Sequence, residues 1–271
     1  MYVRKAEYAG SFYPDIKEDL IKSIENSFSR VKKTEISKRV MGIISPHAGY
    51  VYSGITAAHG YSVLDTETET VLILAPSHKA YFNCGNFIAP ATYETPLGSV
   101  NTEDSFTEYL KGSSLFSEIQ RIDELEHSHE VQIPFLQYVL KDFTVFPVIL
   151  GTNNMKTLKD IAEKLYEAVS KSQKKITVVM SADLSHFHTY DKAEKIDSLF
   201  IKCAEEFDEC ELDKQLSSEK IESCGHASIV CGFILLKLMG AQKLISLNYM
   251  NSGDRTGDKS RVVGYYSAAV I

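Results

Sequence analysis

Short apolar runs followed by residue types that bind metals recur along this chain, and they constrain its fold strongly. The run at 40–45 precedes His47, the run at 71–75 precedes His78, and the run at 176–180 precedes Asp183, His186 and His188. Short apolar runs of this kind are typical of strands buried in a parallel sheet. Ligands bind outside the carboxyl ends of the strands in open α/β sheets. We therefore expect these side chains to lie together in one crevice.

Segments with helical spacing of apolar residues alternate with these runs. Leu158, Ile161 and Leu165 mark one such amphipathic helix, at 155–170. Further helices are predicted at 16–31, 55–64, 192–207 and 227–239, and at 129–140, where Pro134 interrupts the start. Further strands are predicted at 86–91, 143–150, 244–250 and 262–271. This alternation predicts an α/β fold: a single domain over 1–271, with a central, mostly parallel or mixed sheet flanked by helices.

Composition excludes several classes of partner. The 271 residues are 44% hydrophobic and 24% charged, with a net charge of −7, so the chain has no basic footprint for nucleic acid. No apolar run approaches the roughly 20 residues of a membrane span, and the N-terminus lacks the apolar core of a signal peptide. The five cysteines are odd in number and have no CxxC spacing, which favours free thiols in a reducing compartment. We expect a cytoplasmic protein that binds neither nucleic acid nor membrane.

Four segments carry the residues expected to do chemistry. His47 and His78 follow strand ends, where the alternative is a histidine that only caps a loop. His186 is suited to general acid–base catalysis with Asp183 beside it, unless Asp183 simply caps a helix. Cys224 precedes the helix at 227–239, and a helix N-terminus lowers the pKa of a thiol. The alternative for Cys224 is a buried, inert thiol.

Other residues are expected to support the site or to contact substrate. His127 and Glu130 stand three positions apart in a segment rich in ligand types, so one helical face can carry both. A metal-ligand role and a solvated turn both stay open for them. Tyr50 and Tyr52 follow His47 closely and are expected to line a pocket, and His188 is a further candidate for the surroundings of the site.

Several motifs occur in an order that resembles the Memo family, which is named for a mediator of receptor-driven cell motility. They lie at 9–14 (AGSFYP), 46–54 (PHAGYVYSG), 76–78 (PSH), 126–134 (EHSHEVQIP), 181–186 (SADLSH) and 224–225 (CG), and the similarity continues to 265–269 (YYSAA). The resemblance implies the α/β fold of class III extradiol dioxygenases, which use non-haem Fe(II). It also implies that His47, His78 and Cys224 bind a metal, and that His186 acts in acid–base chemistry with Asp183 beside it.

One departure from the dioxygenases bears on the reaction. A cysteine stands where the dioxygenases have a glutamate, and thiolate favours softer ions than carboxylate does. Fe(II) is the metal first expected, with copper or zinc as alternatives. The favoured hypothesis is a metal-dependent oxidoreductase acting on a small aromatic molecule or a peptide side chain. The alternatives are a non-catalytic module that binds a peptide or small molecule, and a hydrolase using metal-activated water or a Cys224–His186 pair.

Overall fold

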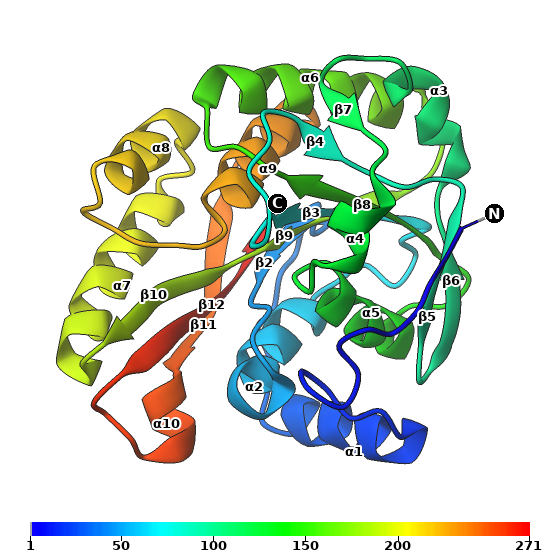
Figure 1. The fold of residues 1–271 in the computed structure, drawn as a ribbon. Coiled ribbons are helices and arrows are strands. Elements are labelled where there is room, and N and C mark those ends of the chain that lie inside the picture. The colour runs from blue at the N-terminus through cyan, green and yellow to red at the C-terminus, as the bar shows by residue number, and fades with distance from the viewer. Residues whose placement is uncertain (1) are drawn as a thin grey trace.

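A computed structural model describes residues 2–271, and its core is a large mixed sheet (Figure 1). Its parallel centre has the strand order β2-β9-β3-β8. These strands are β2 (Gly42–Ser45), β9 (Ile176–Ser181), β3 (Thr70–Pro76) and β8 (Thr144–Leu150). The apolar runs that precede the site residues are therefore neighbouring parallel strands, as their composition predicts.

Antiparallel strands extend this centre on both sides. β12 (Val262–Val270) pairs with β2 at its carboxyl end and with β10 (Asp183–His188) at its amino end. β11 (Leu244–Asn251) pairs along β12, and on the far side β4 (Gly85–Asn86) pairs with β8 and with β7 (Phe116–Ser117). A separate small sheet contains β1 (Tyr2–Arg4), β5 (Ala91–Thr95) and β6 (Gly98–Asn101). The sheet is thus mixed, with its parallel part at the centre.

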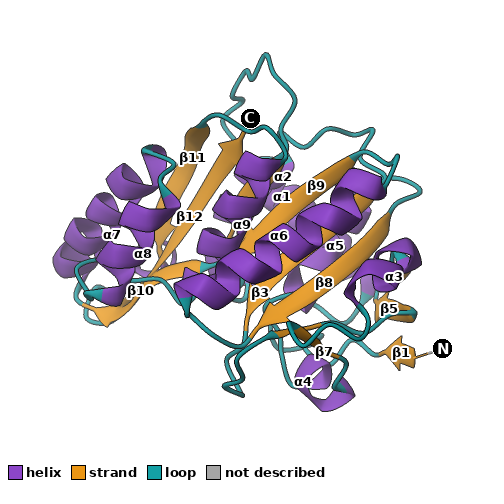
Figure 2. Cartoon of the chain, turned by 90° about the horizontal axis from the view of Figure 1, so that it is seen from above, coloured by secondary structure: helices purple, strands orange, loops and turns teal. Residues whose placement is uncertain are grey.

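Helices cover both faces of the large sheet (Figure 2). Leu72 and Leu74 of β3 belong to one buried cluster with α6 and α9, whereas Val71 and Ile73 belong to the other with α1, α2 and α5. This alternation is the two-residue period of a strand that is buried on both faces. The helices are α1 (Lys17–Phe28), α2 (Tyr50–Tyr61), α3 (Thr107–Leu110), α4 (Gln120–Glu124), α5 (Ile133–Val139), α6 (Met155–Lys171), α7 (Tyr190–Glu205), α8 (Glu209–Ser217), α9 (His226–Leu238) and α10 (Ser252–Thr256), with 3₁₀ turns at Asp104–Phe106 and Glu130–Gln132. Over residues 2–271, none of the helices combines the length and the apolar character needed to cross a bilayer.

Besides short elements that the sequence did not predict, the structure differs from the sequence prediction in three segments. The strand predicted at 86–91 is absent; β4 ends at Asn86 and β5 begins at Ala91, because Pro90 between them has no N–H group for a ladder. The helix predicted from residue 55 begins earlier, at Tyr50. Gly54 in this first part of α2 allows close packing against α1, because a Cβ at position 54 would lie 2.8 Å from Ser27 Oγ. The segment 183–188, for which the sequence predicted no strand, forms the strand β10.

Candidate metal centre

Three donor side chains meet at the carboxyl edge of the parallel strands. His47 follows β2, His78 follows β3, and Cys224 lies just before α9. One donor atom from each lies within 4.8 Å of those of the other two, and Cys224 Sγ is 3.2 Å from His47 Nε2. The strand ends therefore bring these residues together, as the crevice argument predicts.

Hydrogen bonds fix the tautomer of His47. Its Nδ1 lies 2.8 Å from Ser181 Oγ, and the Ser181 hydroxyl donates its own proton to the carbonyl of Ser128 at 2.7 Å. The serine oxygen must therefore accept from His47 Nδ1–H, which leaves the Nε2 lone pair directed toward Cys224. Burial, with the nearby imidazoles of His78 and His127, also lowers the pKa of His47 well below its usual value. A neutral imidazole with a free Nε2 is the metal-binding form.

Glu126 holds His78 in the corresponding way. Its Oε1 lies 2.9 Å from His78 Nδ1, and its Oε2 accepts the backbone N–H of His78 at 2.6 Å. The backbone N–H groups of His127 and Ser128 also donate to Oε1, each at 2.9 Å. Burial alone would raise the pKa of this carboxyl, but the hydrogen bonds from His127 and His78 bring it well below its usual range. An ionised Glu126 keeps the proton on His78 Nδ1 and leaves Nε2 free.

Glu126 was not among the residues selected from the sequence. It occurs in the motif at 126–134, whose density of ligand types drew attention to His127 and Glu130 instead. Its role depends on a hydrogen bond to a residue 48 positions away, which no local pattern contains. The motif at 126–134 was therefore the one feature of the sequence that could have pointed to Glu126.

Asp183 and His186 also lie close to Cys224. One donor atom from each of these three residues lies within 4.8 Å of the others. Asp183 Oδ1 accepts the backbone N–H of His47 at 2.9 Å. His186 Nδ1 lies 2.8 Å from the carbonyl oxygen of Leu184, which can only accept, so His186 carries its proton on Nδ1 and a lone pair on Nε2.

The environment of the Cys224 thiol differs from the prediction. The expected lowering by the helix N-terminus is wrong, because burial and the nearby Asp183 carboxylate raise its pKa well above the usual value. The backbone N–H of Asp183 reaches Sγ at 3.3 Å, and the backbone N–H of Cys224 donates to the Asp183 carbonyl at 3.2 Å. Gly225 allows this close approach, since a Cβ there would lie 2.1 Å from that of Ala182. Cation binding at this sulfur thus requires release of a proton.

His127 adds a third imidazole beside the two histidines of the centre. Its ring centroid lies 4.7 Å from that of His78 and 5.3 Å from that of His47. On its other side its ring packs against Phe12, with centroids 4.5 Å apart. His127 is therefore placed where it can support the centre or touch a ligand, as the sequence suggests.

Four of the other selected residues have different surroundings. Tyr50 is buried in the core and donates its hydroxyl to the carbonyl of Val131, and Tyr52 is 41% exposed on the surface. Neither lines the cavity beside the centre. The buried face of α2 thus carries Tyr50 into the core, whereas Tyr52 lies on the exposed face of the same helix.

The remaining two selected residues bind other parts of the chain. The Glu130 carboxylate is buried and pairs with Arg4 at 2.9 Å, so it anchors the N-terminal strand. His188 Nε2 lies 2.9 Å from a carboxylate oxygen of Glu222. Glu130 and His188 thus form their ion pair and hydrogen bond with residues outside the group His47, His78 and Cys224.

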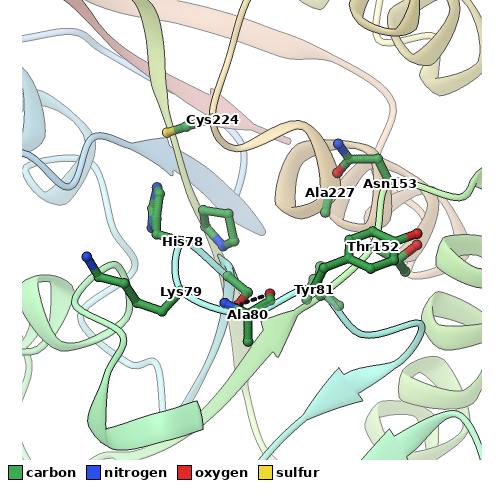
Figure 3. Close-up of a pocket in the computed structure, with 12 residues that line it drawn as sticks. His78, Lys79, Ala80, Tyr81, Thr152, Asn153, Cys224 and Ala227 are labelled. Carbon is green, nitrogen blue, oxygen red and sulfur yellow. Dashed lines mark hydrogen bonds between the residues drawn. The ribbon is translucent and has the colours of Figure 1, made fainter.

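A cavity of about 400 Å³ opens beside the centre (Figure 3). His78 and Cys224 form part of its wall, and Ala227, Thr152 and Asn153 face them from the opposite wall. The loops that follow β3 and β8 supply most of the lining. A small molecule in this cavity would reach the donor atoms directly.

Comparisons with known proteins agree with the motif pattern. Residues 4–269 match the family model described as Memo-like protein. A MEMO1 family protein of Methanobrevibacter smithii is 35% identical over 283 residues, covering 98% of each chain. One from Ignicoccus hospitalis is 36% identical over 277 residues, covering 98% of this chain and 97% of its own. One from Methanosarcina mazei is 35% identical over 276 residues, covering 100% and 99%.

Proposed function

We propose that this chain, which belongs to the Memo family, binds a redox-active transition-metal ion through His47, His78 and Cys224 and acts as a metal-dependent oxidoreductase. The observation that supports this most directly is the meeting of three donor atoms within 4.8 Å. Two separate hydrogen bonds, to Ser181 and to Glu126, prepare both imidazoles to offer Nε2. Such oriented histidines are characteristic of metal sites.

The donor set fits a limited range of ions. Two histidines and one anionic ligand are the set used by non-haem Fe(II) enzymes, with thiolate here in place of carboxylate. We propose Fe(II) as the first candidate, with copper or zinc as the alternatives that a soft thiolate also suits. A bound iron or copper ion would supply electron-transfer chemistry that no side chain provides.

His186 and Asp183 are proposed as the proton-transfer pair. The lone pair on His186 Nε2 can accept a proton from a substrate near Cys224. The Asp183 carboxylate lies close enough to stabilise the imidazolium that results. His186 thus holds the proton, while Asp183 also ties β10 to the loop of His47.

Anaerobic titration of the purified protein with Fe(II), Cu(I) and Zn(II) tests the metal site. Cys224→Ser and His47→Ala should weaken binding by about tenfold or more, because even indirect losses at metal sites commonly cost 10–100-fold. His186→Ala should retain the metal and lose turnover in an O₂-consumption assay. His188→Ala is the matched control, since its ring binds Glu222 instead.

Three results would contradict the proposal or one of its parts. A folded protein that binds none of the three ions would remove the metal-dependent function. Equal loss of metal in His186→Ala and Cys224→Ser would contradict the proton-transfer role of His186. Binding of zinc alone, with no redox response, would favour a hydrolase.

A non-catalytic binding module is the second candidate. Tyr8 and Phe12 pack against His127, with ring centroids 5.6 and 4.5 Å away, so partly exposed aromatic groups stand beside the centre. Aromatic side chains of this kind bind peptide or small-molecule ligands. Ligand binding that persists unchanged in metal-free Cys224→Ser would favour this function.

A further inference from the structure

We infer that Arg4 is a positioning residue for the candidate metal centre: it holds the segment 126–132, which fixes the orientation of both imidazoles. A guanidinium has no lone pair to offer a cation, so Arg4 acts through other residues. Its effect on metal affinity rests on the metal site proposed above. Its effect on the placement of the two rings depends only on hydrogen bonds of the metal-free protein.

One segment orients both histidines of the centre. Glu126 Oε1 lies 2.9 Å from the ring Nδ1 of His78 and accepts its proton. The Ser128 carbonyl accepts the hydroxyl of Ser181, whose oxygen in turn accepts the ring N–H of His47. Two imidazoles that follow different strands therefore depend on the placement of the 126–132 segment.

The same segment also contacts the ends of both strands. Ser128 Oγ donates to the carbonyl of Pro76, the last residue of β3, at 3.0 Å. Gln132 Nε2 donates to the carbonyl of Pro46, which follows β2, at 3.1 Å. A shift of the 126–132 segment would therefore disturb the backbone that carries each histidine as well as the partner of each ring.

Arg4 holds this segment from β1, the N-terminal strand (dark blue in Figure 1). Its side chain is 1% exposed, and it donates to the carbonyl of Glu126 at 3.2 Å and to that of Asp123 at 3.3 Å. It also pairs with the carboxylate of Asp123 at 3.2 Å and with that of Glu130 at 2.9 Å. A guanidinium reaches these groups with five N–H donors, whereas a lysine ammonium has three donors on one nitrogen.

A second set of contacts ties the N-terminal segment to Glu130. The Glu130 carboxylate accepts the backbone N–H groups of Glu7 and Tyr8, at 3.2 and 2.9 Å. It also accepts the hydroxyl of Tyr13 at 2.6 Å. Glu130 is 1% exposed, so these hydrogen bonds are shielded from water. These contacts and those of Arg4 thus converge on the same short segment.

Amide hydrogen exchange in the metal-free, full-length protein tests the link without any assay of activity. The backbone N–H groups of His78, His127 and Ser128 are bound by one carboxylate, so their exchange rates report local opening of the segment. Arg4→Lys keeps a positive charge but cannot make every contact of the guanidinium. It should raise these three rates about tenfold or more beyond any rise in β9, whose core amides report global unfolding.

Metal affinity provides the second readout. In titrations with Fe(II) and Zn(II), Arg4→Lys should bind about three- to tenfold more weakly, less than the 10–100-fold typical of losing a ligand's own partner. Lys5→Met is the matched charge control, because it removes the neighbouring lysine of an exposed pair. Leu165→Ala is the stability control, because it opens a cavity beneath α6, whose buried cluster contains no residue of 126–132. Both controls should bind the ions like wild type.

Tyr13→Phe is a second variant that decides the matter if Arg4→Lys does not fold. It removes one hydrogen bond to Glu130 and leaves every ion pair in place, so it should raise the same three exchange rates by about two- to tenfold. Unchanged rates in Tyr13→Phe would then overturn the inference.

For a folded Arg4→Lys protein, two results would overturn the inference. One is exchange of the three amides that rises no more than exchange in β9. The other, where wild type binds metal, is an affinity equal to that of Leu165→Ala. Failure of the metal site itself has a different signature: wild type then binds neither ion, while the faster exchange of the three amides in Arg4→Lys persists.

Discussion

Replacement of Glu126 by glutamine should damage both the stability of the fold and the affinity for metal. The change keeps the size of the side chain but removes its charge and turns one acceptor oxygen into a donor NH₂ group. Glu126 is 1% exposed, and its two oxygens accept three backbone N–H groups and the ring N–H of His78. An amide cannot satisfy all four donors.

The magnitude follows from these contacts. With the amide oxygen facing His127, Ser128 and the His78 ring, the NH₂ group meets the backbone N–H of His78 at 2.6 Å, and an unsatisfied buried donor costs about 1–3 kcal/mol. The other three hydrogen bonds lose their charge assistance, at about 0.5–1 kcal/mol each. We therefore expect Glu126→Gln to lower the free energy of unfolding by about 3–5 kcal/mol. Metal affinity should fall by about 10–100-fold, because the carboxylate that orients His78 is lost.

Urea denaturation of the metal-free protein and Fe(II) titration measure the two effects separately. Glu124→Gln is the matched control, since that carboxylate is half-exposed and, within residues 2–271, forms an ion pair with Arg121 alone, at 3.3 Å, so its loss should cost at most about 1 kcal/mol. The reasoning is refuted if Glu126→Gln unfolds and binds metal like Glu124→Gln. Loss of stability with unchanged metal affinity would show that Glu126 supports the loop without orienting His78.

Three further perturbations test other parts of the structure. Arg4→Met leaves two buried carboxylates without their cation and should cost about 3–5 kcal/mol in urea denaturation, whereas Lys5→Met, at an exposed pair, should cost under about 1 kcal/mol. Burial favours a higher pKa for Glu103, but hydrogen bonds from a lysine, a serine and a threonine lower it to about 2, so its stabilisation is complete above about pH 4.5 and is lost as the pH falls toward 2. Glu103→Gln should therefore be less stable than wild type at pH 7 and show a smaller fall in stability across that range, measured by denaturation at each pH. Gly225→Ala should destabilise by at least about 1–3 kcal/mol and weaken metal binding, because its Cβ would overlap the neighbouring strand; Gly49→Ala, whose nearest contact would be 3.5 Å, should change the denaturation midpoint little.

The chain's periodicity predicted most of the scaffold. Apolar runs gave the strands β2, β3, β8 and β9, which are buried on both faces, and a run that is apolar nearly all round gave α9. Helical spacing of apolar residues gave α1 and α6, which bury one face. These signals are local, so the sequence alone carries them. Elements with weak or mixed patterns were missed, such as the short strands β4 and β7 and the helix α8. The strands β4 and β7 are two residues long and form only because they pair with neighbouring strands, so their composition gives no signal.

Residue types at strand ends also predicted where the candidate centre lies. His47, His78, Asp183, His186 and Cys224 do come together, because parallel strands deliver their carboxyl ends to one edge. Closeness in sequence was a poor guide beyond this set. Tyr50 is only three positions from His47 but turns into the core. His127 is 80 positions from His47, and its ring packs against the His47 ring.

By itself the sequence thus determined the class of fold, the family and the chemical types of the donors, since these depend on local pattern and motif order. Tertiary structure decided which groups touch. The strand order places β9 between β2 and β3, so Ser181 meets His47 across 134 positions of chain and sets its tautomer. Folding likewise brings Glu126 to His78 and buries the Cys224 thiol beside Asp183, which reverses the pKa shift expected from a helix terminus. Protonation depends on the solvent and charges around an atom, and these exist only once distant segments have packed together.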